Sequence, residues 1–113
     1  MPYIDTHTSA PISEEKKSVL TKKFGRAIEL IPGKSEDYLM LHFAGGCAMA
    51  LGGDTAPSAM CEVTVFGSGA REDYGKVADA LTRILQEELD IAPNRVYVKF
   101  SEHPYWGCGG ILL

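Results

Sequence analysis

Two long segments with apolar residues at helical spacing constrain the fold of this chain more than any other feature. The first follows Ser13, a good N-cap with two acidic residues after it, and is expected to continue to Pro32-Gly33. The second runs from about Arg71 to Leu89 with a regular apolar stripe. Strand-like runs lie before and after each segment, so the pattern predicts a strand-helix-strand unit followed by a second strand-helix-strand unit.

The strand-like runs are rich in β-branched and aromatic residues and lie at residues 1–8, 38–44, 59–66 and 95–100. A loop or a short irregular strand, bracketed by glycines, is expected at residues 45–53, and residues 111–113 form a candidate terminal strand. Each half of the chain can form a right-handed crossover between parallel strands. We therefore predict an α+β fold of β-α-β-β-α-β order, with two helices on one face of a four-stranded mixed sheet.

The second face of this sheet has no helix to cover it. The strands read as nearly continuous apolar runs, which suits burial on both faces. Soluble monomers avoid exposing a large apolar surface. We therefore expect a closed cyclic oligomer that buries the bare sheet faces against each other.

Size and composition exclude several classes of protein. The 113 residues suit a single domain spanning residues 1–113, and the net charge of −4 argues against nucleic acid as the main partner. The longest uncharged stretch is too short for a membrane span, and no apolar run follows the N-terminus, so neither membrane insertion nor a secretory signal is expected. Three cysteines without a C-x-x-C pair suggest no disulfide framework or zinc site, and we expect a reducing, cytoplasmic compartment.

Pro2 is a candidate base. Excision of the initiator methionine before a small residue would leave Pro2 with a free secondary amine at the start of a strand. An α-amino group titrates near 7.7–8.0, and burial or a nearby cation lowers that pKa. Lys34, just after the Pro32-Gly33 turn, could supply the cation and also bind a carboxylate. The alternatives are a common N-terminal dipeptide and a solvated turn lysine.

Several short motifs occur together in a fixed order. They are Met1-Pro2, Gly33-Lys34 with Tyr38 four residues later, residues 51–57 (LGGDTAP), Val65-Phe66-Gly67 and Asn94-Arg95-Val96-Tyr97. In this order and spacing, the chain resembles the macrophage migration inhibitory factor family of the tautomerase superfamily from Pro2 to about Phe100. No single motif is specific, and the joint pattern carries the resemblance.

The resemblance implies a homotrimer whose sheets form a central barrel, with active sites between subunits. Pro2 would then move a proton in a small-molecule α-keto acid such as phenylpyruvate, without a metal or organic cofactor. Lys34 and the backbone at Phe66 match the groups that hold the substrate carboxylate. Tyr38 and Tyr97 match pocket tyrosines, with Tyr97 supplied by a neighbouring subunit.

Lys99, Ser58 and the C-terminal tail depart from the family pattern, although Trp106-Gly107 is retained. Lys99 replaces an asparagine at the pocket mouth, and either favours substrates with a second acidic group or points to solvent. Trp106 belongs to an altered tail, where it lines the pocket or fills a core or interface position. Ser58 replaces the first cysteine of the family's C-x-x-C, so we expect no thiol-redox activity and a core role for Cys61.

Other functions stay open. The resemblance also implies a cytokine-like ligand that leaves cells without a signal peptide and binds a cell-surface receptor. A small-molecule-binding regulatory domain of ferredoxin-like topology shares the same order of elements. The three histidines show no ligand spacing and are expected to be structural or exposed. The lysines of the first helical segment form a basic face, which we interpret as a solvated surface.

Overall fold

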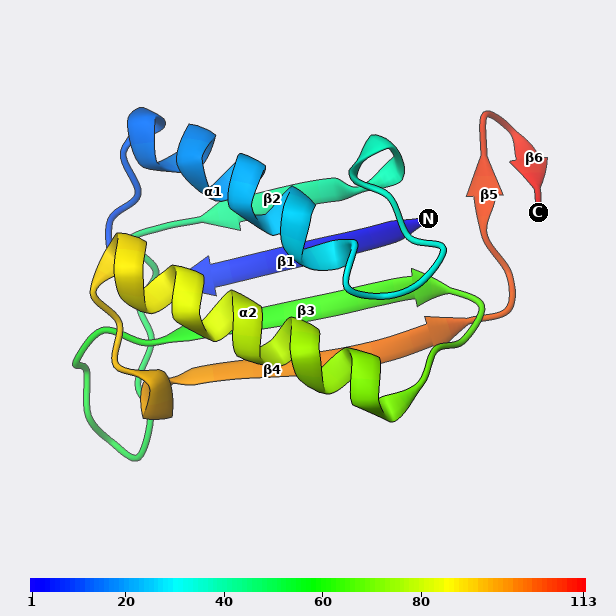
Figure 1. The fold of residues 1–113 in the computed structure, drawn as a ribbon. Helices are drawn as coiled ribbons and strands as arrows, with labels where there is room; N and C mark the ends of the chain where they lie inside the picture. The colour runs from blue at the N-terminus through cyan, green and yellow to red at the C-terminus, as the bar shows by residue number, and fades with distance from the viewer.

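The computed structural model describes all 113 residues and confirms a four-stranded sheet with two helices packed on one face (Figure 1). The main elements are β1 (Pro2–Thr8), α1 (Glu14–Ile28), β2 (Met40–Ala44), β3 (Ala59–Phe66), α2 (Arg71–Leu89) and β4 (Val96–His103). Two 3-10 turns and a C-terminal hairpin complete the chain: η1 (Glu36–Tyr38), η2 (Pro93–Arg95), β5 (Gly107–Cys108) and β6 (Ile111–Leu112).

The sheet is mixed, as predicted, in the order β2-β1-β3-β4. β1 pairs with β2, and β3 with β4, in parallel, and each of these pairs is joined through a helix. The two central strands β1 and β3 are antiparallel, with Ile4 opposite Val63 at the middle of the sheet. Each half of the chain is therefore one β-α-β unit.

The first helix is capped as the sequence predicted but ends earlier. The Ser13 side chain accepts a hydrogen bond from the Lys16 N–H at 3.1 Å. The expected continuation to Pro32 is wrong: the N–H groups of residues 29–31 bond to carbonyls three residues back, which tightens the last turn. Ile31 nevertheless stays in the core. Strand β2 starts at Met40 rather than Tyr38, because residues 36–38 form η1.

The core lies between the sheet and the helices. Phe24 of α1 and Leu81 of α2 are fully buried, and Ile4 and Val63 meet them from the sheet. α2 has the predicted bounds and ends where Asp90 adopts a left-handed conformation with φ of 56°. Neither helix combines the length and apolar character needed to cross a bilayer.

The open face of the sheet is polar, so the expectation of an apolar bare face is wrong. Side chains alternate along each strand, and the apolar members point to the helices. All the charged and histidine residues of β1, β2 and β3 lie on the other face, whereas Thr6 and Thr8 of β1 are buried on the helical side. Together with four methionine and aromatic residues, this open face comprises Tyr3, Asp5, His7, Met40, His42, Met60, Glu62, Thr64, Tyr97, Lys99 and Ser101.

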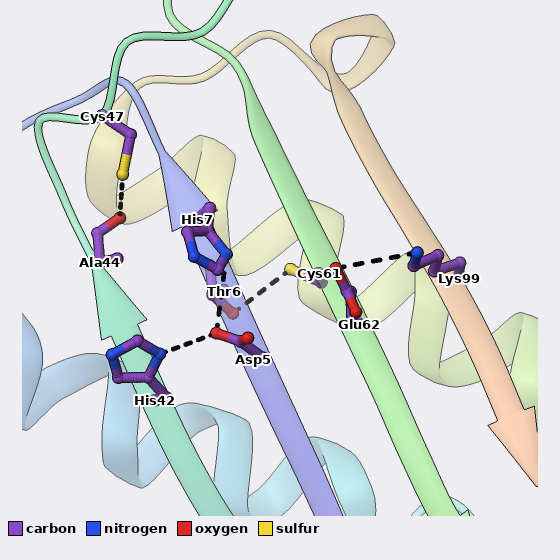
Figure 2. A network of polar contacts seen from close by, with 9 residues as sticks. All are labelled: Asp5, Thr6, His7, His42, Ala44, Cys47, Cys61, Glu62 and Lys99. Atoms are coloured by element: carbon purple, nitrogen blue, oxygen red, sulfur yellow. Dashed lines mark hydrogen bonds and ion pairs between the residues drawn. The ribbon is translucent and has the colours of Figure 1, made fainter.

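Neighbouring strands are linked across this face by polar contacts (Figure 2). Asp5 Oδ1 lies 2.8 Å from His42 Nδ1 and 3.6 Å from His7 Nδ1. Glu62 Oε1 lies 3.7 Å from Lys99 Nζ, directly opposite it in the register of β3 and β4. His7, His42 and Lys99 thus contact carboxylates on the open face.

Candidate active site

A cavity of about 800 Å³ opens at the end of the sheet where the N-terminus lies beside the β5–β6 hairpin (Figure 1). Three segments far apart in the sequence form its walls: the start of β1, η1 with the start of β2, and the C-terminal tail. Its lining residues are Met1, Pro2, Tyr3, Asp37, Tyr38, Leu39, Met40, Trp106, Gly107, Cys108 and Gly109.

Pro2 is buried at the first position of β1, opposite Val65 of β3. Met1 precedes it, and the Met1 carbonyl accepts a hydrogen bond from the Phe66 N–H at 3.0 Å. With Met1 attached, the Pro2 nitrogen is an amide and cannot act as a base. Burial, and next the charge of Lys34, lower the pKa of the amine on Met1. This end of the sheet therefore disfavours an ammonium ion.

Lys34 reaches the same point from the connection between α1 and β2. Gly33, at φ of 81°, turns the chain after the helix, and the Lys34 N–H bonds to the Ile31 carbonyl. The Lys34 Nζ then donates to the Phe66 carbonyl at 2.8 Å. Lys34 is thus held at the end of β3, at the residue whose N–H is occupied by Met1.

Tyr38 stands on η1, which packs closely against α1. A Cβ at Gly25 of the helix would overlap the Glu36 carboxylate, so a larger residue there would force the Glu36 side chain to move. Tyr38 is 63% exposed even though it lines the cavity. The cavity is therefore open to solvent on this side.

Trp106 lines the opposite wall and is held by the C-terminal hairpin. Gly109 and Gly110, both at positive φ, form the two-residue turn between β5 and β6. The Leu113 N–H donates to the Trp106 carbonyl at 2.8 Å, and the indole packs edge-on to His103. The altered tail thus brings an aromatic wall to the cavity.

Tyr97 and Lys99 lie away from this cavity within one protomer. Pro2 is opposite Val65, and Val65 is opposite Glu102, so Tyr97 lies five positions earlier along β4. At ~3.3 Å per residue, it is about 16 Å from the level of Pro2, and Lys99 is about 10 Å away. Pro2, Tyr38 and Trp106 line the cavity of a single protomer. Lys34 and Phe66 are not among its lining residues, but they adjoin Met1 through the hydrogen bonds described above.

Arg95 has a structural role that sequence reasoning missed. Its guanidinium donates to the carbonyls of Asp54, Ala56 and Pro57 at 2.9–3.0 Å. The motif at residues 51–57 and the motif at residues 94–97 are therefore one unit, which fixes the start of β4. The signal available in the sequence was that Arg95 belongs to the second of these two motifs.

The cysteines differ in their surroundings. Cys61 is fully buried, as expected, and burial raises the pKa of its thiol to about 11, although a hydrogen bond from Thr6 opposes the shift. Cys108 is exposed in the cavity wall. No three histidine, cysteine, aspartate or glutamate side chains converge on a point that could hold a metal ion.

The fold and cavity define a β-α-β-β-α-β protein in which a proline at the first position of β1 lines the cavity. The family model for macrophage migration inhibitory factor matches residues 1–111, and the chain belongs to this family. The chain is 33% identical over 102 residues to the macrophage migration inhibitory factor homolog of Brugia malayi, covering 90% of this chain and 88% of the relative. It is 31% identical over 111 residues to the D-dopachrome decarboxylase of Bos taurus, covering 96% and 92%.

Solved structures agree with this assignment. The structure is similar to that of Leishmania major MIF2, with a TM-score of 0.94 and 25% identity over 100% of this chain and 97% of the other. The homologue from Prochlorococcus marinus has a TM-score of 0.82 and 27% identity, covering 97% of each chain. Family membership supports a tautomerase or a cytokine-like role.

Proposed function

We propose that this protein is a cofactor-independent keto-enol tautomerase acting on α-keto acids of the phenylpyruvate type. The observation that carries the proposal is the junction of Met1, Phe66 and Lys34 at the cavity. Excision of Met1 would release the Pro2 amine and the Phe66 N–H together, next to the cation of Lys34. A base, a hydrogen-bond donor and a positive charge would then face one cavity.

The chemistry follows from these three groups. The neutral amine of Pro2 accepts a proton from the carbon beside the keto group, and electron density moves to the keto oxygen as the enol forms. A proton then returns to oxygen or carbon, so no oxidant or reductant is consumed. Lys34 and the Phe66 N–H hold the carboxylate, and Tyr38 and Trp106 confine the aromatic ring.

A homotrimer would complete the site. The cavity is open beside Tyr38, while Tyr97 is 53% exposed at the far end of β4. A neighbouring subunit could therefore bring Tyr97, and Lys99 with it, to the open side. There Lys99 would exchange its contact with Glu62 for a second acidic group on the substrate.

The test is enol-keto conversion of phenylpyruvate, followed by ultraviolet absorbance on samples whose Met1 removal is verified by intact mass. The Pro2→Gly variant from which Met1 has been removed, called processed Pro2→Gly, should lose most of the activity and keep the oligomeric state of the parent. Pro11→Gly makes the same chemical change at an exposed proline outside the cavity and should keep full activity. Full activity in Pro2→Gly would refute the assignment of the base.

A cytokine-like role is the second candidate, favoured by the similarity to the Brugia malayi homolog. In that case, a cell-surface receptor would bind processed Pro2→Gly as tightly as the parent protein. The two roles are compatible, and the same variant separates them because only catalysis needs the ring amine.

A further inference from the structure

The outer surface of the two helices carries a second hollow, unrelated to the cavity at Pro2. It is a shallow depression between α1 and α2, open to solvent, with a volume of about 390 Å³. Its floor is apolar and its rim is charged. The floor is formed by Ala27, Leu30, Ala80 and Ile84, and the rim by Lys23, Arg26, Arg83 and Glu87.

One rim cation, Arg26, has no ion-pair partner, and neither does Lys22 beside it on α1. Lys16 and Lys23 both contact Glu88, and Arg83 pairs with Asp79. Arg26 and Lys22 lie one turn apart on α1, are exposed, and have no carboxylate within ion-pair distance. Both line a smaller hollow that adjoins the groove through Lys23 and Arg26. This positive site stands on a chain whose net charge is −4.

We propose that the α1–α2 groove, defined by these floor and rim residues, docks an acidic peptide segment of a partner protein. One apolar side chain of the peptide would enter the hollow above Ala27 and Ala80. Carboxylates on either side of it would pair with Arg26 and Lys22. Leu30, 42% exposed at the edge of the floor, would be covered by the same segment.

Charge count favours a peptide over other anionic partners. Proteins that bind duplex DNA commonly neutralise about 6–10 phosphates. This groove offers one unpaired cation, Arg26, with Lys22 next to it in the adjoining hollow. Recruitment to an anionic membrane commonly uses clusters of about 4–8 basic residues. A concave apolar floor also suits an inserted side chain better than a flat lipid surface. Because the groove is on the helical side of the sheet (Figure 1), assembly through the open face would leave it accessible.

The probe is a fluorescein-labelled helical peptide in which glutamates flank one leucine, with binding followed by fluorescence anisotropy at low salt. Two matched peptides replace the glutamates with lysines, or the leucine with alanine. We expect the acidic leucine peptide to bind, and each matched peptide to bind about tenfold more weakly or worse. Backbone amide shifts caused by the acidic peptide should be confined to α1 and α2.

Charge reversal supplies the decisive comparison. Arg26→Glu should weaken the acidic peptide about tenfold and strengthen the lysine peptide. Arg71→Glu makes the same change at an exposed, unpaired arginine at the far end of α2 and should leave both affinities within about twofold of the parent. Lys22→Glu, at an exposed position, serves if Arg26→Glu misfolds by circular dichroism.

Equal effects of Arg26→Glu and Arg71→Glu would overturn the proposal. So would amide shifts centred on the open face or on the cavity at Pro2. Binding of a fluorescent oligonucleotide or a phosphatidylserine vesicle that depends on Arg26, without binding of the acidic peptide, would assign the groove to a different class of partner and also overturn it.

Discussion

Retention of Met1 should weaken the binding of substrate carboxylates as well as remove the base. The Phe66 N–H is the group at stake, because the Met1 carbonyl occupies it at 3.0 Å. A hydrogen bond to a charged acceptor contributes about 1.5–3 kcal/mol, so masking this donor should raise the dissociation constant about 10- to 150-fold. Lys34 stays available in both forms, so binding should weaken without being lost.

The assay uses 3-phenylpropionate, which has the ring and carboxylate of phenylpyruvate but cannot tautomerise. Protein that retains Met1 is produced with an inhibitor of methionine aminopeptidase, and both forms are verified by intact mass. Calorimetric titration then gives the two dissociation constants. Processed Pro2→Gly is the matched control: it has lost the ring amine but its Phe66 N–H is free, so it should bind like the processed parent and turn over slowly.

Met1 also fills part of the cavity, and this effect must be separated from the masked donor. The neutral amide of the same acid occupies the same volume but makes a weaker hydrogen bond with the Phe66 N–H. Retention of Met1 should therefore weaken the acid more than the amide. An equal loss for both would refute the reasoning, because Met1 would then act only by occupying space.

Three further outcomes are expected. Lys34→Ala should move the acid limb of the pH–kcat/KM profile to higher pH. The proposed base works as the neutral amine, and the charge of Lys34 lowers the pKa of the N-terminal amine, so removing that charge lets the pKa rise. An unmoved limb would contradict the electrostatic role of Lys34. Arg95→Ala should lower the free energy of unfolding, measured by urea titration, by about 2 kcal/mol because three hydrogen bonds to carbonyls are lost. Arg95→Lys should recover only part of this loss, because a lysine lacks the planar set of guanidinium donors. Cys61 should stay unreactive toward a thiol reagent at pH 8, because burial raises the pKa of its thiol to about 11, while the exposed Cys108 should react. Rapid labelling of Cys61 in folded protein would show that the core opens.

Local patterns were sufficient for the elements and their order. The Ser13 cap and the apolar stripe of α2 act within one or two turns, so a single sequence contains the information. The end of α1 was predicted too late because its last turn tightens through main-chain hydrogen bonds, and no side-chain pattern in the sequence indicates them. Tyr38 was placed in a strand because an aromatic residue beside apolar ones suits a strand, whereas Ser35 instead caps a 3-10 turn there.

The open face shows where composition misleads. Asp5, His7 and Glu62 look like isolated interruptions of apolar runs, yet strand alternation collects them on one surface. The candidate site was predictable in part for a similar reason. Pro2, Lys34 and Trp106 lie in three distant segments. Residue chemistry suggested that Lys34 could act on the Pro2 amine, and only the resemblance to a family pattern suggested that Trp106 belongs to the same site. The link from Arg95 to residues 54–57 depends on tertiary geometry and left no periodic signal.

The hydrogen bond from Phe66 to Met1 also bears on when the chain can be processed. Met1 is half-buried and its carbonyl extends the pairing of β1 with β3, so a peptidase would have to peel the strand end away to reach the scissile bond. Removal of Met1 is therefore expected to be faster before β1 pairs with β3 than after it. If Pro2 is the base proposed above, a copy that folds with Met1 attached would lack it, and the fraction of active molecules would depend on how much Met1 is removed before folding.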